Sequence, residues 1–169
     1  ASLRWVAVAA CVVGAMTFLV PQEEGALDFR LKGGAADLVV HRVKGDVAER
    51  LQEGSAAAQG DRLQVSLLGA AGLHVIVVSV DGRGEVTQHH PITGDSTRVV
   101  DTVFSIPNSY QLDDSPGFER FFVVSSKSQI QTKRVVEAVR KLVANGQAER
   151  GRLELPSEWG VSDLRLQKG

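Results

Sequence analysis

The four histidines are the residues best suited to metal or acid–base chemistry in this chain of 169 residues. His41 and His74 alternate with apolar neighbours, which is typical of outward-facing strand residues. His89 and His90 are adjacent, and adjacent side chains on a regular strand point to opposite faces, so we expect them not to share one ion. A catalytic zinc ion commonly has three protein ligands, and no spacing of the histidines supplies three. The sequence therefore predicts no metal site.

Two further pairs of polar residues could serve catalysis. Ser125 and Ser126 follow an apolar run, and a serine at a strand end can act as a nucleophile when a histidine lies beside it in space. A hydrolase of this kind is one alternative, although the chain lacks the G-x-S-x-G elbow. Asp113 and Asp114 could pair as carboxylates, but the Ser-Pro-Gly that follows them is typical of a turn. We predict no catalytic residue, no cofactor site and no enzyme activity.

Composition excludes several classes of protein. The chain is 43% hydrophobic and 23% charged, which excludes global disorder. Its net charge of −1 lacks the basic footprint of a nucleic-acid binder, so no nucleic-acid partner is expected. The single cysteine excludes an internal disulfide framework and a cysteine-based zinc ribbon.

The first twenty residues are the most apolar part of the chain. Residues 5–20 carry no charge, and a helix that also includes Leu3 and Arg4 is about 27 Å long. A signal peptide and a buried helix are alternatives, but the run is long for the first and lacks the polar stripe of the second. We predict a transmembrane anchor over residues 1–21. It contacts the bilayer through residues 3–20, chiefly through Trp5, Val6, Val8, Val12, Val13, Met16, Phe18, Leu19 and Val20.

The charges around this run predict its orientation. Arg4 precedes it and Glu23 and Glu24 follow it, which favours a cytoplasmic N-terminus and an external C-terminal part. Cys11 lies within the run and is expected to act as a small hydrophobic residue. Residues 22–169 are therefore predicted to form an extracytoplasmic domain.

Most of residues 22–169 follow the pattern of β-structure. Residues 73–80 and 118–126 are apolar on both faces, which is typical of central strands that are covered on both sides. Residues 81–84 predict a tight turn into a strand over 85–89, and Pro91 predicts that this strand is short or lies at an edge. Further short strands are predicted over 27–31, 38–43, 47–51, 63–67, 98–106, 110–112, 152–155 and 161–166.

One amphipathic helix is predicted after the second buried strand. Ser128 is its expected N-cap, and Asn145-Gly146 is expected to end it. Its polar face is either a solvated surface or a docking face for an anionic partner or lipid headgroups. The basic residues expected on that face are Lys127, Lys133, Arg134, Arg140 and Lys141, opposed by the single acid Glu137. The predicted fold class is mainly β: a β-sandwich with one prominent amphipathic helix, preceded by a transmembrane helix.

The order of short motifs along the chain resembles a bacterial family. After the apolar segment come residues 29–34 (FRLKGG), Gly54, residues 60–63 (GDRL), Gly72, 80–84 (VDGRG), Pro91, 117–121 (GFERF) and 164–168 (LRLQK). This layout resembles the extracytoplasmic β-rich domain of unknown function that follows a single membrane helix in many anti-sigma-factor-like membrane proteins. Those relatives carry a His-x-x-x-Cys-x-x-Cys zinc region before the helix, and this chain has no such residues. The resemblance therefore implies only the outer half of such a regulator.

These observations lead to one expected function and one alternative. We expect a non-enzymatic, membrane-anchored interaction or signal-input module, single-pass in the bacterial inner membrane, with its C-terminal domain in the periplasm. It would act as the outer part of an anti-sigma-type regulator and bind protein partners in the membrane or periplasm. The alternative is a structural or accessory subunit of an envelope membrane complex.

Overall fold

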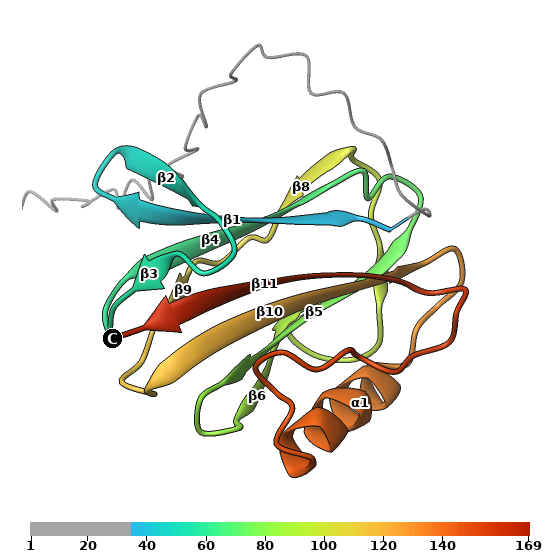
Figure 1. Cartoon of the computed structure of the whole chain (residues 1–169). Coiled ribbons are helices and arrows are strands. Elements are labelled where there is room, and N and C mark those ends of the chain that lie inside the picture. The colour runs from blue at the N-terminus through green and yellow to red at the C-terminus, as the bar shows by residue number, and fades with distance from the viewer. Residues whose placement is uncertain (1–34) are drawn as a thin grey trace, which may run out of the picture.

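The computed structural model describes residues 35–169, which form two packed β-sheets and one helix. Figure 1 shows three layers: a five-stranded sheet (sheet A), a six-stranded sheet (sheet B), and the helix α1 (Thr132–Ala144) against the outer face of sheet B. The prediction of a mainly β fold with one helix is confirmed. The predicted anchor over residues 1–21 and the predicted strand over 27–31 lie outside the described residues.

Sheet A contains the first hairpin of the described chain. Its strand order is β2-β1-β4-β8, with β9 pairing with β4 beyond the end of β8. Gly45 forms the turn from β1 to β2 with a φ of 58°, in the region that favours glycine. The strands are β1 (Asp37–Lys44), β2 (Val47–Leu51), β4 (Arg62–Leu68), β8 (Val103–Ser105) and β9 (Tyr110–Gln111).

Sheet B contains the two apolar runs as neighbouring antiparallel strands. Its order is β3-β11-β10-β5-β6, with β7 pairing with β5. β10 lies between β5 and β11, and β5 lies between β10 and β6. Both strands contribute side chains to an apolar core on each face of the sheet, so the prediction of central, doubly covered strands is confirmed for both runs. The strands are β3 (Ala56–Ala57), β5 (His74–Asp81), β6 (Val86–His90), β7 (Thr97–Arg98), β10 (Gly117–Ser126) and β11 (Gly160–Lys168).

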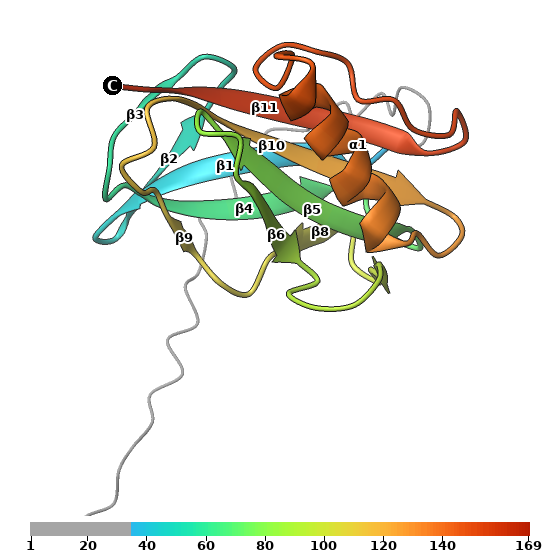
Figure 2. The same cartoon turned by 90° about the horizontal axis from the view of Figure 1, so that it is seen from below.

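Sheet B separates two apolar cores. Phe121 belongs to the core between the two sheets (the inner core), and its neighbour Phe122 belongs to the core beneath α1 (the outer core); neither side chain is exposed. This division follows from the alternation of side chains along a strand. Figure 2 shows α1 crossing the strands of sheet B on its outer side.

Two predicted strands are wrong. Residues 98–106 do not form one strand, because β7 belongs to sheet B and β8 to sheet A, and the chain crosses between the sheets there. The amides of Gly69 and Gly72 donate to the carbonyls of Thr102 and Val99, and these bonds stabilise the irregular path. Residues 152–155 form no strand either. Their alternation reflects Leu153 and Leu155 packing into the outer core.

The predicted helix start is also wrong. Ser128 does not cap α1, which begins at Thr132. The Thr132 amide donates to Asp95 Oδ1 at 3.0 Å, and its hydroxyl donates to the Gly94 carbonyl at 2.8 Å, so the cap comes from a loop far away in the sequence. The predicted end is confirmed: Asn145 is the C-cap and Gly146 follows with a φ of 67°.

Candidate functional site

The exposed face of α1 carries four of the five predicted basic residues; the fifth, Lys127, precedes the helix and is not on this face. Lys133, Arg134, Arg140 and Lys141 are all exposed, and we refer to these four side chains as the basic row. The apolar side of the same helix buries Val135, Val139 and Leu142 against sheet B. The 3.6-residue period of the helix therefore separates a packed face from a charged one.

The acidic groups around the basic row neutralise it only in part. Glu137 lies 3.8 Å from Lys133, and Glu154 lies 2.6 Å from Lys141. All four of these side chains are more than half exposed, so the two pairs contribute little to stability. Among the described residues, no acidic side chain pairs with Arg134 or Arg140. The row therefore presents an excess of positive charge.

Arg134 connects the basic row to a pocket. Its guanidinium lies 5.0 Å from the centroid of the Trp159 ring, in a cation–π contact. Trp159 lines a pocket of about 340 Å³ between the segment 152–159 and the outer face of β10 and β11. This volume lies at the lower end of the range for ligand pockets. Its walls combine the apolar residues Phe122, Leu153 and Leu155 with the charged residues Arg152 and Asp163.

Arg120 forms the inner wall of this pocket and holds the neighbouring loop. Its guanidinium contacts Asp163 Oδ2 at 2.8 Å and donates to the carbonyls of Ala148 and Gly151. It also lies 4.6 Å from the centroid of the Phe122 ring. Because these bonds engage both ends of the guanidinium, we assign Arg120 a structural role.

The side chains of His89 and His90 do not point to opposite faces as expected for neighbours on a regular strand. A β-bulge between Val77 and Val78 leaves His89 as the extra residue on β6. His89 Nε2 lies 2.8 Å from Ser79 Oγ, and its ring lies 5.5 Å from that of Phe121. The His90 ring lies 5.0 Å from Phe104, so both histidines face the inner core. Burial lowers the pKa of His89 to about 4 and also lowers the pKa of His90.

The other two histidines lie apart from this pair. His41 and His74 are half-buried on β1 and β5, on different sheets. Burial, followed by the charge of Arg50, lowers the pKa of His41. In the described part of the chain, no three His, Cys, Asp or Glu side chains gather to hold a metal ion.

The two serines are engaged by backbone amides. Ser125 Oγ accepts from the Ala36 amide at 3.1 Å, and Ser126 Oγ accepts from the Ser128 amide at 3.1 Å. Within residues 35–169, neither hydroxyl bonds to a histidine. Ser125 instead anchors the chain just before β1 to the end of β10.

Asp113 and Asp114 contact different cations, so they do not act as a carboxylate pair. Asp114 Oδ1 lies 2.8 Å from the exposed guanidinium of Arg83. Asp113 Oδ1 lies 2.6 Å from Lys168 Nζ and accepts from the Ser115 amide at 2.9 Å. These bonds lower the pKa of both carboxyls, with Lys168 as the main cause for Asp113 and Arg83 for Asp114.

A buried polar cluster at one end of the two sheets was missed by the sequence analysis. Glu119 on β10 is 1% exposed, and its Oε2 has no hydrogen-bond partner. Lys168, whose side chain is 2% exposed, places its Nζ 3.7 Å from that oxygen. The sequence did contain a sign of this cluster. Residues 118–126 were predicted to be covered on both faces, and a strand of that kind must bury both Glu119 and Arg120.

The cluster extends to neighbouring strands. Tyr110 on β9 packs edge-on against His89 at 4.7 Å. Burial raises the pKa of Tyr110, and the nearby charge of Glu119 raises it further. Burial also raises the pKa of Glu119, although Ser79 and Lys168 offset part of this effect. A buried carboxyl group therefore lies beside a buried ammonium, and the half-buried imidazole of His89 joins the same cluster through Ser79 and Tyr110.

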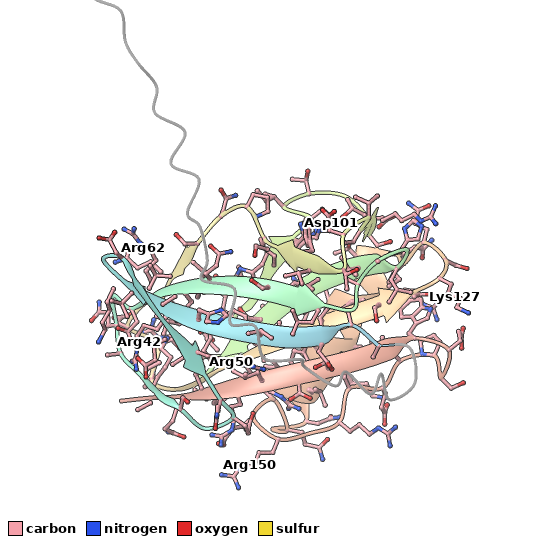
Figure 3. All side chains as sticks on the ribbon, turned by 90° about the horizontal axis from the view of Figure 1, so that it is seen from above. Arg42, Arg50, Arg62, Asp101, Lys127 and Arg150 are labelled. Carbon is pink, nitrogen blue, oxygen red and sulfur yellow. The ribbon has the colours of Figure 1, made fainter. Side chains whose placement is uncertain are left out.

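The predicted anchor residues lie in the part of the chain that is not described. They are Trp5, Val6, Val8, Val12, Val13, Met16, Phe18, Leu19 and Val20. Among residues 35–169, no helix is both long and apolar enough to span a bilayer. Figure 3 labels other exposed basic residues of the fold, with Arg62 and Lys127 at opposite ends of the molecule and Arg50 over sheet A.

Comparison of the chain with protein-family models, curated proteins and solved structures found no match.

Proposed function

We propose that the protein is a membrane-anchored, extracytoplasmic interaction module that binds an acidic segment of a partner protein through its helix layer. The observation that carries this proposal is the basic row, which stands exposed on the outermost layer and keeps an excess of positive charge. Charged groups placed in this way steer and orient an oppositely charged partner. The proposed function is binding and includes no catalytic step.

The pocket beside the basic row favours a protein partner over lipid headgroups. Trp159 links Arg134 to a pocket whose walls combine Leu153 and Leu155 with charged side chains. A peptide can place carboxylates along α1 and one further side chain in the pocket, where it meets both apolar and charged groups. A headgroup engages the charges alone. In the regulatory role expected from the family resemblance, this contact is the signal input.

A charge-reversal experiment tests the proposal on the full chain in its native membrane. R134E/R140E reverses two residues of the basic row, and R50E/R62E is the matched control, since both of its residues are exposed on sheet A. After cross-linking and mild-detergent purification, we expect the wild type and the control to retain one partner and R134E/R140E to lose it. A lysine substitution at an acidic residue of that partner should restore binding to R134E/R140E.

Three results would overturn the proposal. One is a partner that is retained by R134E/R140E, and another is a loss that the partner's charge swap does not rescue. The third is a lipid result: the wild type binds phosphatidylglycerol vesicles without any partner protein, and R134E/R140E does not. That result would assign the basic row to lipid. A partner bound in fixed stoichiometry under all conditions would instead match the accessory-subunit alternative.

Labelling tests the location separately. A cysteine introduced at Ser157, an exposed residue of the segment beside the pocket, should react with a membrane-impermeant maleimide in intact cells. Protection of this cysteine until the cells are lysed would contradict an extracytoplasmic domain.

A further inference from the structure

A single ammonium group joins three parts of the chain at the end of the inner core. Lys168 is the last residue of β11, and it pairs in register with Gly117, the first residue of β10. Its Nζ lies 2.6 Å from Asp113 Oδ1 in the β9–β10 connection and 3.7 Å from Glu119 Oε2 on β10. The shorter contact is a charge-assisted hydrogen bond, whereas the longer one is not a hydrogen bond.

Glu119 Oε2 therefore has no hydrogen-bond partner although it is buried, and the ammonium of Lys168 stays 3.7 Å away. An ionised carboxylate in this position carries a large desolvation penalty unless it is paired, and a protonated carboxyl group does not. The contacts of Lys168 match the protonated form, because the ammonium is bound to Asp113 and leaves Glu119 Oε2 free.

We infer that Lys168 is a proton-controlled clasp: it binds Asp113 while Glu119 holds its proton, and it moves to Glu119 when that proton is released to solvent. The Asp113 side chain is 45% exposed, so water can solvate its carboxylate after Lys168 leaves. The move then frees the β9–β10 connection from the end of β11. The device is independent of the function proposed above for the basic row.

The surroundings of Glu119 support this exchange. The carboxylates of Asp81 and Asp113 oppose its ionisation, and Lys168 favours it. His89 remains neutral above about pH 5, because burial lowers its pKa to about 4, so it supplies no competing positive charge there. The titratable and hydrogen-bonding groups around Glu119 are Ser79 and Asp81 on β5, His89 on β6, Tyr110 on β9, Asp113 in the β9–β10 connection and Lys168 on β11.

Hydrogen exchange of the Ser115 amide reports how firmly the β9–β10 connection is held, since this amide donates to Asp113 Oδ1, the oxygen that Lys168 also contacts. In the wild-type chain, we expect its protection factor to fall as the pH rises through the pKa of Glu119, which burial holds above the ordinary value. The expected fall is about tenfold for each unit by which the pKa of Glu119 with Lys168 bound to Asp113 exceeds its pKa with Lys168 bound to Glu119. In E119Q, which cannot ionise, the protection factor should stay constant. A carboxyl titration by NMR should place the Glu119 midpoint above the ordinary glutamate value.

Two variants separate the clasp from a general loosening of the fold. K168M removes the clasp, so the Ser115 amide should be weakly protected at every pH. D114N changes the neighbouring carboxylate, which pairs with Arg83 instead, and should keep the wild-type profile. Any of three results would overturn the clasp. The Ser115 protection factor could fall in E119Q as it does in the wild type, or it could be independent of pH in the wild type. The third result is an ordinary glutamate midpoint in the carboxyl titration of Glu119.

Discussion

The two faces of sheet B are covered in different ways. The inner core is assembled from strands spread over the whole described chain, from β1 to β11. The outer core is covered by one continuous stretch, residues 127–159, which contains α1 and connects the neighbouring strands β10 and β11. The inner core also contains the polar cluster at one end, whereas the main buried charge on the outer side is Arg120. We infer that the two-sheet stack forms the framework and that the helix layer, which carries the basic row, is added to it as a unit.

Phe121 and Phe122 give the largest expected effects and the most direct comparison of the two cores. Each alanine substitution should lower the free energy of unfolding by about 3–5 kcal/mol, since each removes a fully buried aromatic ring. In a W5F background, fluorescence reports only Trp159 in the helix layer, whereas circular dichroism reports the sheets. F122A should shift the fluorescence transition in urea below the circular-dichroism transition, and F121A should shift both together. Coincident transitions in F122A would show that the two cores unfold as one.

His89 should make the inner core sensitive to acid. Its pKa of about 4 in the folded chain lies below the ordinary value of 6.5, so the unfolded chain binds the proton more tightly. Its contribution to stability is full above about pH 6.5 and falls as the pH drops towards about 4, by at most about 3 kcal/mol. Urea unfolding of the wild type and H89Q across this range measures the difference. H41Q, at a half-buried position on sheet A, should change the profile less; an equal change in both variants would contradict this expectation.

Arg120 tests the ion pair on the outer side. R120M should cost roughly 1.5–3 kcal/mol, because the carbonyls of Ala148 and Gly151 lose a charged donor. The control is R83M, which breaks an Arg–Asp pair of the same 2.8 Å length at an exposed site and should cost much less. Equal costs in chemical denaturation would show that burial does not decide the strength of these pairs.

Gly84 tests how closely the β5–β6 turn packs against α1. A Cβ at Gly84 would lie 2.7 Å from Val143 Cγ1, and the residue has a φ of 83°. Gly45 has a φ of 58° with no neighbouring atom within 4 Å, so G45A should cost only the left-handed strain of about 1–2 kcal/mol. G84A should cost more than G45A, and V143A should recover the difference. Thermal unfolding of G84A, G45A and the double variant G84A/V143A measures the loss of stability in each variant. Equal losses in G84A and G45A would show that the β5–β6 turn does not pack closely against α1.

Several features of the fold could be predicted from local sequence alone. The runs over 73–80 and 118–126 are long, apolar and rich in β-branched or aromatic residues, so their central position followed from composition. The turn at residues 81–84 and the helix end at Asn145-Gly146 followed from the backbone preferences of Asp, Asn and Gly.

Other features depend on contacts that sequence spacing does not encode. The helix begins at Thr132 because Asp95 reaches its amide from another loop, while Ser128 looked equally suitable as a cap. His89 and His90 share a face because of a bulge whose position depends on pairing with β5. The residues 98–106 read as one strand, yet hydrogen bonds to the 69–73 loop divide them between two sheets.

The sequence by itself determined where most strands and turns lie, which two strands are covered on both faces, and that one helix has a basic side. These properties arise from the local periodicity of side chains and from the backbone preferences of single residues. Only the tertiary structure decided that Glu119 and Lys168 meet in the inner core, that Arg120 holds the outer loop, and that Trp159 joins the basic row to a pocket. Each of these contacts brings together groups that are far apart in the chain, and their positions depend on strand pairing and on the packing of α1.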